Sequence, residues 1–459
     1  MFGKIKHFHL IGIGGIGMSG IAELLSDWGY TISGSDANYS DNITRVEQQG
    51  IKVHIGHRAA NVTGCDAVIY SAAVESTNPE LQAARNQGIP VIKRAKILGE
   101  ILRARPNSIA IAGTHGKTTT TSLIGHLFLS AGRDPIIIAG GVLKELNSTI
   151  HNGNGDTIIV EADEFDHSFH QLYPTHIVLT SVDPEHLDTY GNLDSIRDSF
   201  VKFVNRLPFY GKLILTDDDQ NIQSILPQVT VNFAKYSIEH NCEIQAANIR
   251  LSESASEFDI MVSGKKLGLI HLPLTGAHNV KNALAAIAIG LEYGIDIQTC
   301  ASALKTFGGV KRRFDILHQS AELMLVDDYA HHYREIEATL KAAKSGWRRR
   351  IIAIFQPHLY SRTQAFYREF AQALQLADVV VLLNIYPARE KPIEGVSTKL
   401  IYEVLKAAGH PHIHLIEEKA TAPELIKSLY QKGDMIITLG AGDVFKLHQS
   451  LKNLINEKI

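Results

Sequence analysis

The sequence predicts an α/β protein of three domains, and three observations support this prediction. The chain has 459 residues, which is too many for a single hydrophobic core. Short apolar runs alternate with helix-like segments, a pattern typical of parallel sheets covered by helices. Glycine-rich turns follow two of these runs, at residues 12–17 and 113–116. We expect Rossmann-like N-terminal and C-terminal domains around a central domain with a P-loop ATPase-type parallel sheet and a small antiparallel part.

The first predicted domain covers residues 1–104. Its expected strands are residues 7–11, 30–33 and 67–71, and its expected helices are residues 18–28 and 79–87. Residues 103–107 are expected to form a linker, because Pro106 cannot continue the preceding helix.

The second predicted domain covers residues 105–315. Its expected strands are residues 108–112, 157–161, 176–181 and 212–216, and a helix is expected over residues 279–291. Short alternating runs over residues 229–271 suggest an antiparallel insertion.

The third predicted domain covers residues 316–459. Its expected strands are residues 323–326, 350–355, 379–383 and 435–439, and its expected helices are residues 334–344 and 368–375. Apolar runs of this length are typical of buried parallel strands.

Composition argues against several classes of protein. Lys and Arg number 45 against 48 Asp and Glu, for a net charge of -3, whereas a dedicated nucleic-acid binder usually has a basic excess. Three widely spaced cysteines offer neither a disulfide framework nor a CxxC metal site. We see no signal peptide and no apolar stretch of about 20 residues, the length that spans a bilayer. We therefore expect a cytoplasmic protein that binds neither nucleic acid nor membrane.

The second glycine-rich turn has the features of a phosphate-binding loop. It joins an apolar strand to a helix, so backbone N–H groups and the helix dipole favour a bound anion. Lys117 is placed to contact the β- and γ-phosphates, and the Thr118 hydroxyl to bind Mg²⁺. Ile111 stands where the full pattern has its first glycine, and a tight turn without a ligand is the alternative. The expected nucleotide contacts are Gly113, Thr114, His115, Gly116, Lys117, Thr118 and Thr119.

The first glycine-rich turn matches GxGxxG after a strand, with Asp36 about 20 residues further on. Glycines at these positions let the backbone approach a pyrophosphate. The motif therefore indicates a diphosphate and does not identify a nicotinamide. NAD binding, or glycines that serve packing alone, are the alternatives.

Acidic side chains and a histidine follow two strands of the second domain. Glu161 ends one expected strand, and His186 follows another within the run 183–188. Ligands of open α/β sheets bind at this edge, where a carboxylate and an imidazole could hold Mg²⁺ beside a γ-phosphate. An exposed loop acid or a helix cap is the alternative for each residue.

Polar clusters also end the strands of the third domain, at residues 327–332, 355–362 and 384–390. His331 and His332 are adjacent and point in different directions, so at most one is expected to be functional. No regular ligand spacing supports a zinc site.

Taken together, these motifs resemble the Mur ligase family, in the branch that adds L-alanine to UDP-N-acetylmuramate. The resemblance covers nearly the whole chain, and the order and spacing of its motifs are more specific than any one of them. Its carriers are residues 12–19, 113–120, 161–164, 278–283, 310–314, 327–332 and 355–358.

The resemblance implies an ATP- and Mg²⁺-dependent ligase with UDP-sugar-binding, ATP-binding and amino-acid-side domains, acting as a monomer or weak homodimer. The muramate carboxylate would attack ATP to give an acyl phosphate and ADP. The neutral amine of L-alanine would then form the amide and release phosphate.

The resemblance also implies roles for individual residues. Thr118 and Glu161 would hold one Mg²⁺, and Glu161 and His186 a second. His278 and Asn282 would contact adenine, Asp328 ribose and Arg313 phosphate, while Asn279 would belong to the catalytic site. His332 and Arg362 would form the alanine side. The expected UDP-sugar contacts are Gly14, Gly15, Ile16, Gly17, Asp36, His57 and Ser71.

Two residues depart from the family pattern. Leu359 stands where Arg is common, and Tyr333 where Pro is common. A ligase that joins a whole peptide to UDP-N-acetylmuramate is the nearest alternative, although residues 355–358 favour the alanine enzyme. An NAD-dependent dehydrogenase would leave Lys117, Glu161 and His186 without a role. A non-catalytic nucleotide sensor would not need two metal ligands and a third domain with polar strand ends.

Overall fold

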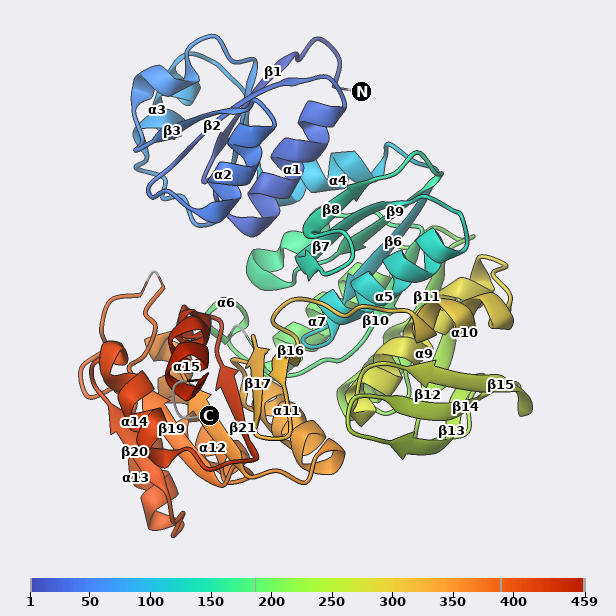
Figure 1. Cartoon of the computed structure of the whole chain (residues 1–459). Coiled ribbons are helices and arrows are strands. Elements are labelled where there is room, and N and C mark those ends of the chain that lie inside the picture. The colour runs from blue at the N-terminus through green and yellow to red at the C-terminus, as the bar shows by residue number, and fades with distance from the viewer. Residues whose placement is uncertain (1, 186, 389, 457–459) are drawn as a thin grey trace. The chain divides into compact units, whose positions relative to one another are not determined.

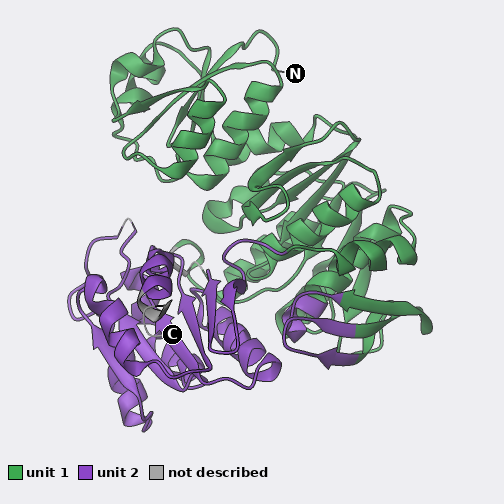
Figure 2. Cartoon of the chain, in the orientation of Figure 1, with its two compact units in different colours: residues 1–248, 258–271, 281–308 green, residues 249–257, 272–280, 309–459 purple. Residues whose placement is uncertain are grey.

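The structure is a computed structural model that describes residues 2–185, 187–388 and 390–456. Three sheets follow one another along the chain (Figure 1). By its internal contacts the chain divides into two compact units (Figure 2). Unit 1 contains Met1–Asn248, Phe258–His271 and Lys281–Gly308, and unit 2 contains Ile249–Glu257, Leu272–Val280 and Gly309–Ile459. The α/β class and the three sheet-based domains are as predicted.

The first sheet is parallel throughout and has the strand order β3-β2-β1-β4-β5. This is the Rossmann order, and the direction of winding reverses beside β1. The glycine-rich turn at residues 12–17 follows β1 and therefore lies at the switch point where such sheets bind ligands. The elements are β1 His7–Ile11, α1 Ile16–Asp27, β2 Thr31–Asp36, α2 Asp41–Gln48, β3 Lys52–Ile55, η1 Ala59–Val62, β4 Ala67–Tyr70, α3 Pro79–Asn86, β5 Val91–Lys93 and α4 Arg94–Leu102.

The second sheet has ten strands in the order β15-β14-β13-β12-β11-β10-β6-β9-β7-β8. Strand β6, which precedes the phosphate-binding loop, pairs in parallel with both β9 and β10. The strands are β6 Asn107–Ala112, β7 Ile136–Leu143, β8 Ser148–Asn152, β9 Thr157–Glu161, β10 His176–Leu179, β11 Lys212–Thr216, β12 Phe233–Ser237, β13 Ile244–Leu251, β14 Ser256–Val262 and β15 Lys265–Leu272. The helices are α5 Lys117–Ser130, η2 Phe165–Gln171, α6 Leu187–Tyr190, α7 Leu193–Val204, α8 Gln220–Ile225, η3 Leu226–Gln228, α9 Ala277–Glu292 and α10 Ile297–Lys305.

The predicted antiparallel insertion over residues 229–271 is wrong for its first two strands. Strand β12 pairs in parallel with β11, and β13 pairs in parallel with β12. Helix α8 lies between β11 and β12 in the chain and provides the crossover that a parallel pair requires. An antiparallel pair does occur at the opposite edge of the sheet, between β7 and β8.

The third sheet has the order β16-β17-β21-β18-β19-β20, with β16 antiparallel and the other pairs parallel. Successive strand residues are buried in two separate clusters, so helices cover both faces. Helix α12 begins at Tyr360, eight residues before the expected helix at 368. The elements are β16 Asp315–Gln319, β17 Leu323–Asp328, α11 Tyr333–Gly346, β18 Ile351–Phe355, α12 Tyr360–Leu374, β19 Val379–Leu383, α13 Lys399–Ala407, β20 Ile413–Ile416, η4 Lys419–Thr421, α14 Ala422–Leu429, β21 Asp434–Leu439, η5 Val444–Lys446 and α15 Leu447–Asn456.

Within the described ranges, no helix combines the length and the apolar character needed to cross a membrane.

Candidate active site

The turn between β6 and α5 requires glycine at two positions. Gly113 has φ +128°, and a Cβ there would lie 2.3 Å from Thr180 Oγ1. Gly116 has φ +81° and is the N-cap of α5, which runs for 14 residues. Left-handed backbone of this kind favours glycine. The tight turn therefore leads directly into the N-terminus of α5. The N-terminus of a helix is a common binding site for phosphates.

The first residues of this loop form hydrogen bonds with the segment that follows β10. Thr114 N donates to Ser181 O at 3.1 Å, and His115 N donates to Ser181 Oγ at 2.8 Å. The first bond of the helix ladder runs from Thr120 N to Gly116 O, at 2.9 Å. The backbone N–H groups of Lys117, Thr118 and Thr119 precede that bond and so lack acceptors within the helix. Among the predicted phosphate contacts, these three are the best placed to bind an anion through the backbone.

Lys117 makes a close ion pair that the sequence did not predict. Its Nζ lies 2.7 and 2.9 Å from the two carboxylate oxygens of Glu164 and 2.6 Å from Gly113 O. Glu164 is 3% exposed. Burial alone would lower the pKa of Lys117, but the Glu164 charge raises it above its ordinary value. Burial raises the pKa of Glu164 to about 7, although Lys117 opposes that shift.

Glu161 ends β9, on the strand directly beside β6. Gly140 N donates to Glu161 Oε2 at 2.8 Å, which fixes the direction of the carboxylate. A Cβ at Gly140 would lie 2.6 Å from the same oxygen. Thr118, the other expected oxygen ligand in this part of the chain, lies in the first turn of α5. His186, the third predicted metal ligand, lies outside the described residues.

Asn282 lies against the phosphate-binding loop. Thr120 Oγ1 donates to Asn282 Oδ1 at 3.2 Å, and a Cβ at Gly116 would lie 2.7 Å from that oxygen. His278 is exposed near the start of α9, whereas Asn279 is buried and donates from Nδ2 to Thr275 O at 2.8 Å. The adenine contacts predicted for His278 and Asn282 and the catalytic role of Asn279 stay predictions.

The glycine-rich turn of the first sheet is held by side chains of its own domain. Gly14 N donates to Asp36 Oδ2 at 2.9 Å, and Asn42 Nδ2 donates to Gly14 O at 2.9 Å. Arg94 also reaches this turn, because a Cβ at Gly17 would lie 2.6 Å from its Nη1. A guanidinium suits a diphosphate. Arg94 was missed because it begins α4, far along the chain from the motif.

Two of the predicted UDP-sugar contacts, Ser71 and His57, fall in different surroundings. Ser71 lies beside the turn, 3.3 Å from where a Cβ at Gly12 would stand. His57 belongs to a buried network instead, with its Nδ1 3.1 Å from Ser35 Oγ and 3.2 Å from Glu80 Oε2. This network gives His57 a structural role whether or not it touches a ligand.

In unit 2, Asp328 ends β17 and stabilises a strained turn. Its carboxylate accepts hydrogen bonds from Phe314 N at 2.9 Å, Ala330 N at 2.8 Å and Thr339 Oγ1 at 3.1 Å. Phe314 and Arg312 both have positive φ, at 42° and 61°. Burial raises the pKa of Asp328 to about 6. The ribose contact expected of Asp328 stays a prediction, and its hydrogen bonds indicate a structural role as well.

The neighbouring arginines of this turn differ sharply. Arg312 stacks on the rings of Tyr329 and Phe445 and donates to Asp327 Oδ2 at 3.1 Å and Gly440 O at 2.6 Å. Arg313 also lies over the Tyr329 ring, at 5.2 Å, but it approaches Glu335 only to 3.9 Å, and its side chain is 30% exposed. Arg313, the predicted phosphate contact, is thus the arginine that makes fewer polar contacts within its own unit.

The two adjacent histidines face different neighbours, as expected. His332 is fully buried, with its ring 5.4 Å from that of Phe366. The His331 ring lies 5.9 Å from the ring of His358. Arg362 Nη1 in turn lies 3.4 Å from His358 Nδ1. His331 and His358 therefore join the predicted Arg362 in one cluster, while the predicted His332 packs against α12.

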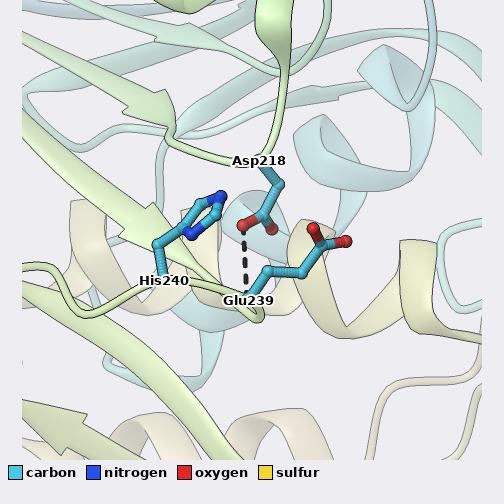
Figure 3. A group of neighbouring side chains, drawn as sticks. All are labelled: Asp218, Glu239 and His240. Carbon is cyan, nitrogen blue, oxygen red and sulfur yellow. Dashed lines mark hydrogen bonds between the residues drawn. The ribbon is translucent and has the colours of Figure 1, made fainter.

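One further group of side chains, two acids and a histidine, has the spacing of a metal site. Asp218, Glu239 and His240 lie close enough together to hold an ion, as Figure 3 shows. Asp218, however, already accepts hydrogen bonds from Ile238 N at 3.0 Å and Glu239 N at 3.3 Å. Lys281 Nζ adds a positive charge 3.3 Å away. Asp218 therefore serves to hold the turn after β12, and we assign no metal to it.

Comparisons with known proteins agree with this arrangement of strands and motifs. Three family models match in order: the Mur ligase family catalytic domain at residues 7–106, the Mur ligase middle domain at 111–290, and the Mur ligase glutamate ligase domain at 312–442. The UDP-N-acetylmuramate--L-alanine ligase of Geotalea daltonii is 42% identical over 457 residues, 100% of both chains. That of Geobacter sulfurreducens is 44% identical over 97% of both chains.

The chain belongs to the Mur ligase family. Among solved structures of this family, UDP-N-acetylmuramate-alanine ligase from Thermotoga maritima matches with a TM-score of 0.84 and 28% identity, over 99% of this chain and 100% of that one. A murein peptide ligase from Psychrobacter arcticus matches with a TM-score of 0.74 and 26% identity, over 99% of both chains. The family accounts for the three sheets.

Proposed function

We propose that this protein is an ATP-dependent ligase that joins L-alanine to UDP-N-acetylmuramate in peptidoglycan precursor synthesis. The observation that carries the proposal is the full-length identity of 42% to 44% with ligases of that name. The loop after β6 supports it, because Lys117 begins the helix that follows this loop and Glu161 ends β9, the strand beside β6, at the edge of the sheet where a γ-phosphate would be transferred.

The nucleotide end of the reaction is assigned to unit 1. The first turn of α5 binds the phosphates, and Lys117 neutralises charge on the group in transfer. Thr118 and Glu161, with His186 from the sequence, would hold Mg²⁺, which neutralises phosphate charge when bound. A muramate carboxylate oxygen then attacks the γ-phosphorus. The bond to the bridging oxygen breaks, so that an acyl phosphate forms and ADP leaves.

The UDP-sugar is assigned to the glycine-rich turn of the first sheet. Its glycines carry no side chains that would block a diphosphate, and Arg94 supplies a positive charge beside Gly17. The Rossmann strand order supports this assignment, because the turn lies at the switch point of the sheet. Ser71 is retained as a contact, and Asp36 acts by holding the turn.

The amino acid is assigned to the cluster of His331, His358 and Arg362 in unit 2. The forked guanidinium of Arg362 suits a carboxylate. A neutral amine is needed for attack on the acyl phosphate, and a histidine near it can accept a proton at neutral pH. The amine nitrogen forms the amide bond, and phosphate leaves. His332 is placed behind this cluster, where it orients α11 and α12.

Product analysis separates this proposal from its nearest alternative. The purified protein is incubated with UDP-N-acetylmuramate, Mg-ATP and either L-alanine or a cell-wall tripeptide, and the products are weighed by mass spectrometry. We expect the product of L-alanine addition and no tripeptide adduct. A tripeptide adduct alone would identify a peptide ligase, and binding of NAD by calorimetry would favour a dehydrogenase.

A further inference from the structure

Glu164 already contacts the ammonium group of Lys117, the group that the proposed function assigns to the phosphates of ATP. The Nζ of Lys117 faces both oxygens of Glu164, at 2.7 and 2.9 Å, and two backbone carbonyls, Gly113 O at 2.6 Å and Thr114 O at 3.2 Å. An ammonium group has three N–H donors. The acceptors around it already exceed its donors, so each new contact to a phosphate oxygen must replace one of the present contacts.

Glu164 is fixed in place and lies in acidic surroundings. The Tyr190 hydroxyl donates to the main-chain oxygen of Glu164 at 2.6 Å, and the residue opens η2 as its N-cap. The charges of Asp163 and Glu185 both act on its carboxylate and disfavour ionisation. The positive charge of Lys117 favours ionisation of the same carboxylate. The pair therefore joins a buried carboxylate to a largely buried ammonium group, and separating them costs free energy.

We propose that Glu164 is a resident counter-ion that competes with the phosphates of ATP for Lys117. Nucleotide binding then includes transfer of the ammonium group from carboxylate oxygens to phosphate oxygens. The carboxylate positions Lys117 before nucleotide binds and lowers the affinity for ATP below the value that the loop alone would give. This inference rests on the proposed function, since it takes the loop to bind ATP.

Calorimetric titration of the full chain with ATP, ADP and AMP tests the proposal. Glu164→Gln removes the charge at nearly constant shape, so Lys117 is released to the phosphates. We expect the Kd for Mg-ATP to fall about tenfold, as for loss of a competing hydrogen bond between charged groups. The Kd for AMP should not change, because AMP has no β- or γ-phosphate for Lys117 to contact. Unchanged or weaker ATP binding by Glu164→Gln would overturn the proposal.

A double-mutant cycle separates competition for Lys117 from a general effect of charge. In the Lys117→Ala background, Glu164→Gln should leave the Kd for ATP unchanged, because no ammonium group remains to be released. Equal tightening with and without Lys117 would mean long-range repulsion of phosphate, and the proposal would fail. Asp163→Asn is the matched control, since Asp163 is a neighbouring acid that pairs with Arg94 at 3.5 Å. Its effect on ATP affinity should be much smaller.

Two further measurements keep the outcome decisive. Thermal unfolding of each variant reports whether the fold survives. If Glu164→Gln does not fold, Glu164→Asp replaces it, because the shorter side chain withdraws the carboxylate from Lys117. Tighter ATP binding by Glu164→Asp supports the proposal, and unchanged binding contradicts it. If the unmodified protein fails to bind Mg-ATP, the proposed function itself is at fault; if it binds and the variants do not differ, only this inference fails.

Discussion

Gly140 is the residue whose substitution tests the assignment of Glu161 most cleanly. An added Cβ would stand 2.6 Å from Glu161 Oε2 and 2.8 Å from Oε1, so Gly140→Ala must turn the carboxylate away. Loss of a group that orients a metal ligand typically weakens metal affinity by 10- to 100-fold. We expect a rise of that size in the concentration of Mn²⁺ needed for binding in the presence of ATP, measured by electron paramagnetic resonance.

The control for Gly140→Ala is Gly268→Ala in β15, where an added Cβ meets nothing within 4 Å. That variant should bind Mn²⁺ as the unmodified protein does. If Gly140→Ala also binds Mn²⁺ normally while remaining folded, Glu161 is not a metal ligand.

At the residue scale, the sequence indicated which types of residue belong to the candidate site. It did not indicate which of two adjacent residues of the same type belongs there. Adjacent residues 331 and 332 read alike in sequence, and only the packing of Phe366 against His332 distinguishes them. Arg312 and Arg313 also read alike, yet Arg312 is enclosed by two rings and two acceptors. The Lys117–Glu164 pair joins positions 47 apart on separate elements, so no local pattern could have indicated it.

At the scale of elements, the loop between β18 and α12 carries the amino-acid assignment. Leu359 has φ 71° and caps the helix, a strained backbone of the kind often found at functional sites. Arg362 follows in the first turn and is 9% exposed. Arg362→Lys keeps the charge and loses the fork. We expect KM for L-alanine to rise at least tenfold and KM for ATP to change little.

Arg368→Lys on the same helix is the matched control, because Arg368 is exposed and contacts the ring of Tyr367. It should leave both KM values unchanged. Equal shifts of the two KM values in Arg362→Lys would show that the alanine carboxylate is held elsewhere.

A second prediction concerns the buried network that ties α3 and η1 to the first sheet. Burial would raise the pKa of Glu80, but the nearby His9 ring, 3.7 Å away, and hydrogen bonds from Ser35 and Asn61 outweigh it and lower the pKa to about 2. The ordinary value is 4.5. The stabilisation is therefore fully present above pH 4.5 and is lost as the pH falls towards 2.

Glu80→Gln should cost roughly 1–3 kcal/mol of stability at pH 7, because buried partners lose a charged acceptor. The difference from the unmodified protein should shrink as the pH falls from 5 towards 2, as measured by denaturant unfolding of both proteins. A difference that stays constant over this range would mean that Glu80 does not titrate as the network requires.

The positions of several buried strands were predicted well from their apolar runs. The strands at residues 7–11, 157–161, 212–216 and 379–383 have the expected bounds. The start of α12 was missed because its first turn is polar and its cap, Leu359, is not a usual capping residue. The pairing of β12 was missed because short alternating strands do not reveal which neighbour they join.

At the scale of the whole molecule, the three sequence blocks become three sheets but two compact units. Segments 249–257 and 272–280 group with unit 2 by their contacts, although they fall inside the predicted central domain. The predicted nucleotide contacts are divided in the same way, with the phosphate-binding loop in unit 1 and Arg313 and Asp328 in unit 2. Each sheet supplies residues predicted to bind at least one substrate, which is consistent with a reaction that needs three substrates.

The central claim is that one polypeptide couples ATP cleavage to amide formation between UDP-N-acetylmuramate and L-alanine. Phosphate release is measured with all three substrates and Mg²⁺ present, and again with each omitted in turn, alongside a panel of other amino acids. The account predicts one phosphate per amide formed, no release when UDP-N-acetylmuramate or the amino acid is omitted, and L-alanine as the preferred amino acid. Phosphate release that is independent of UDP-N-acetylmuramate, or no release with the complete set, would contradict it.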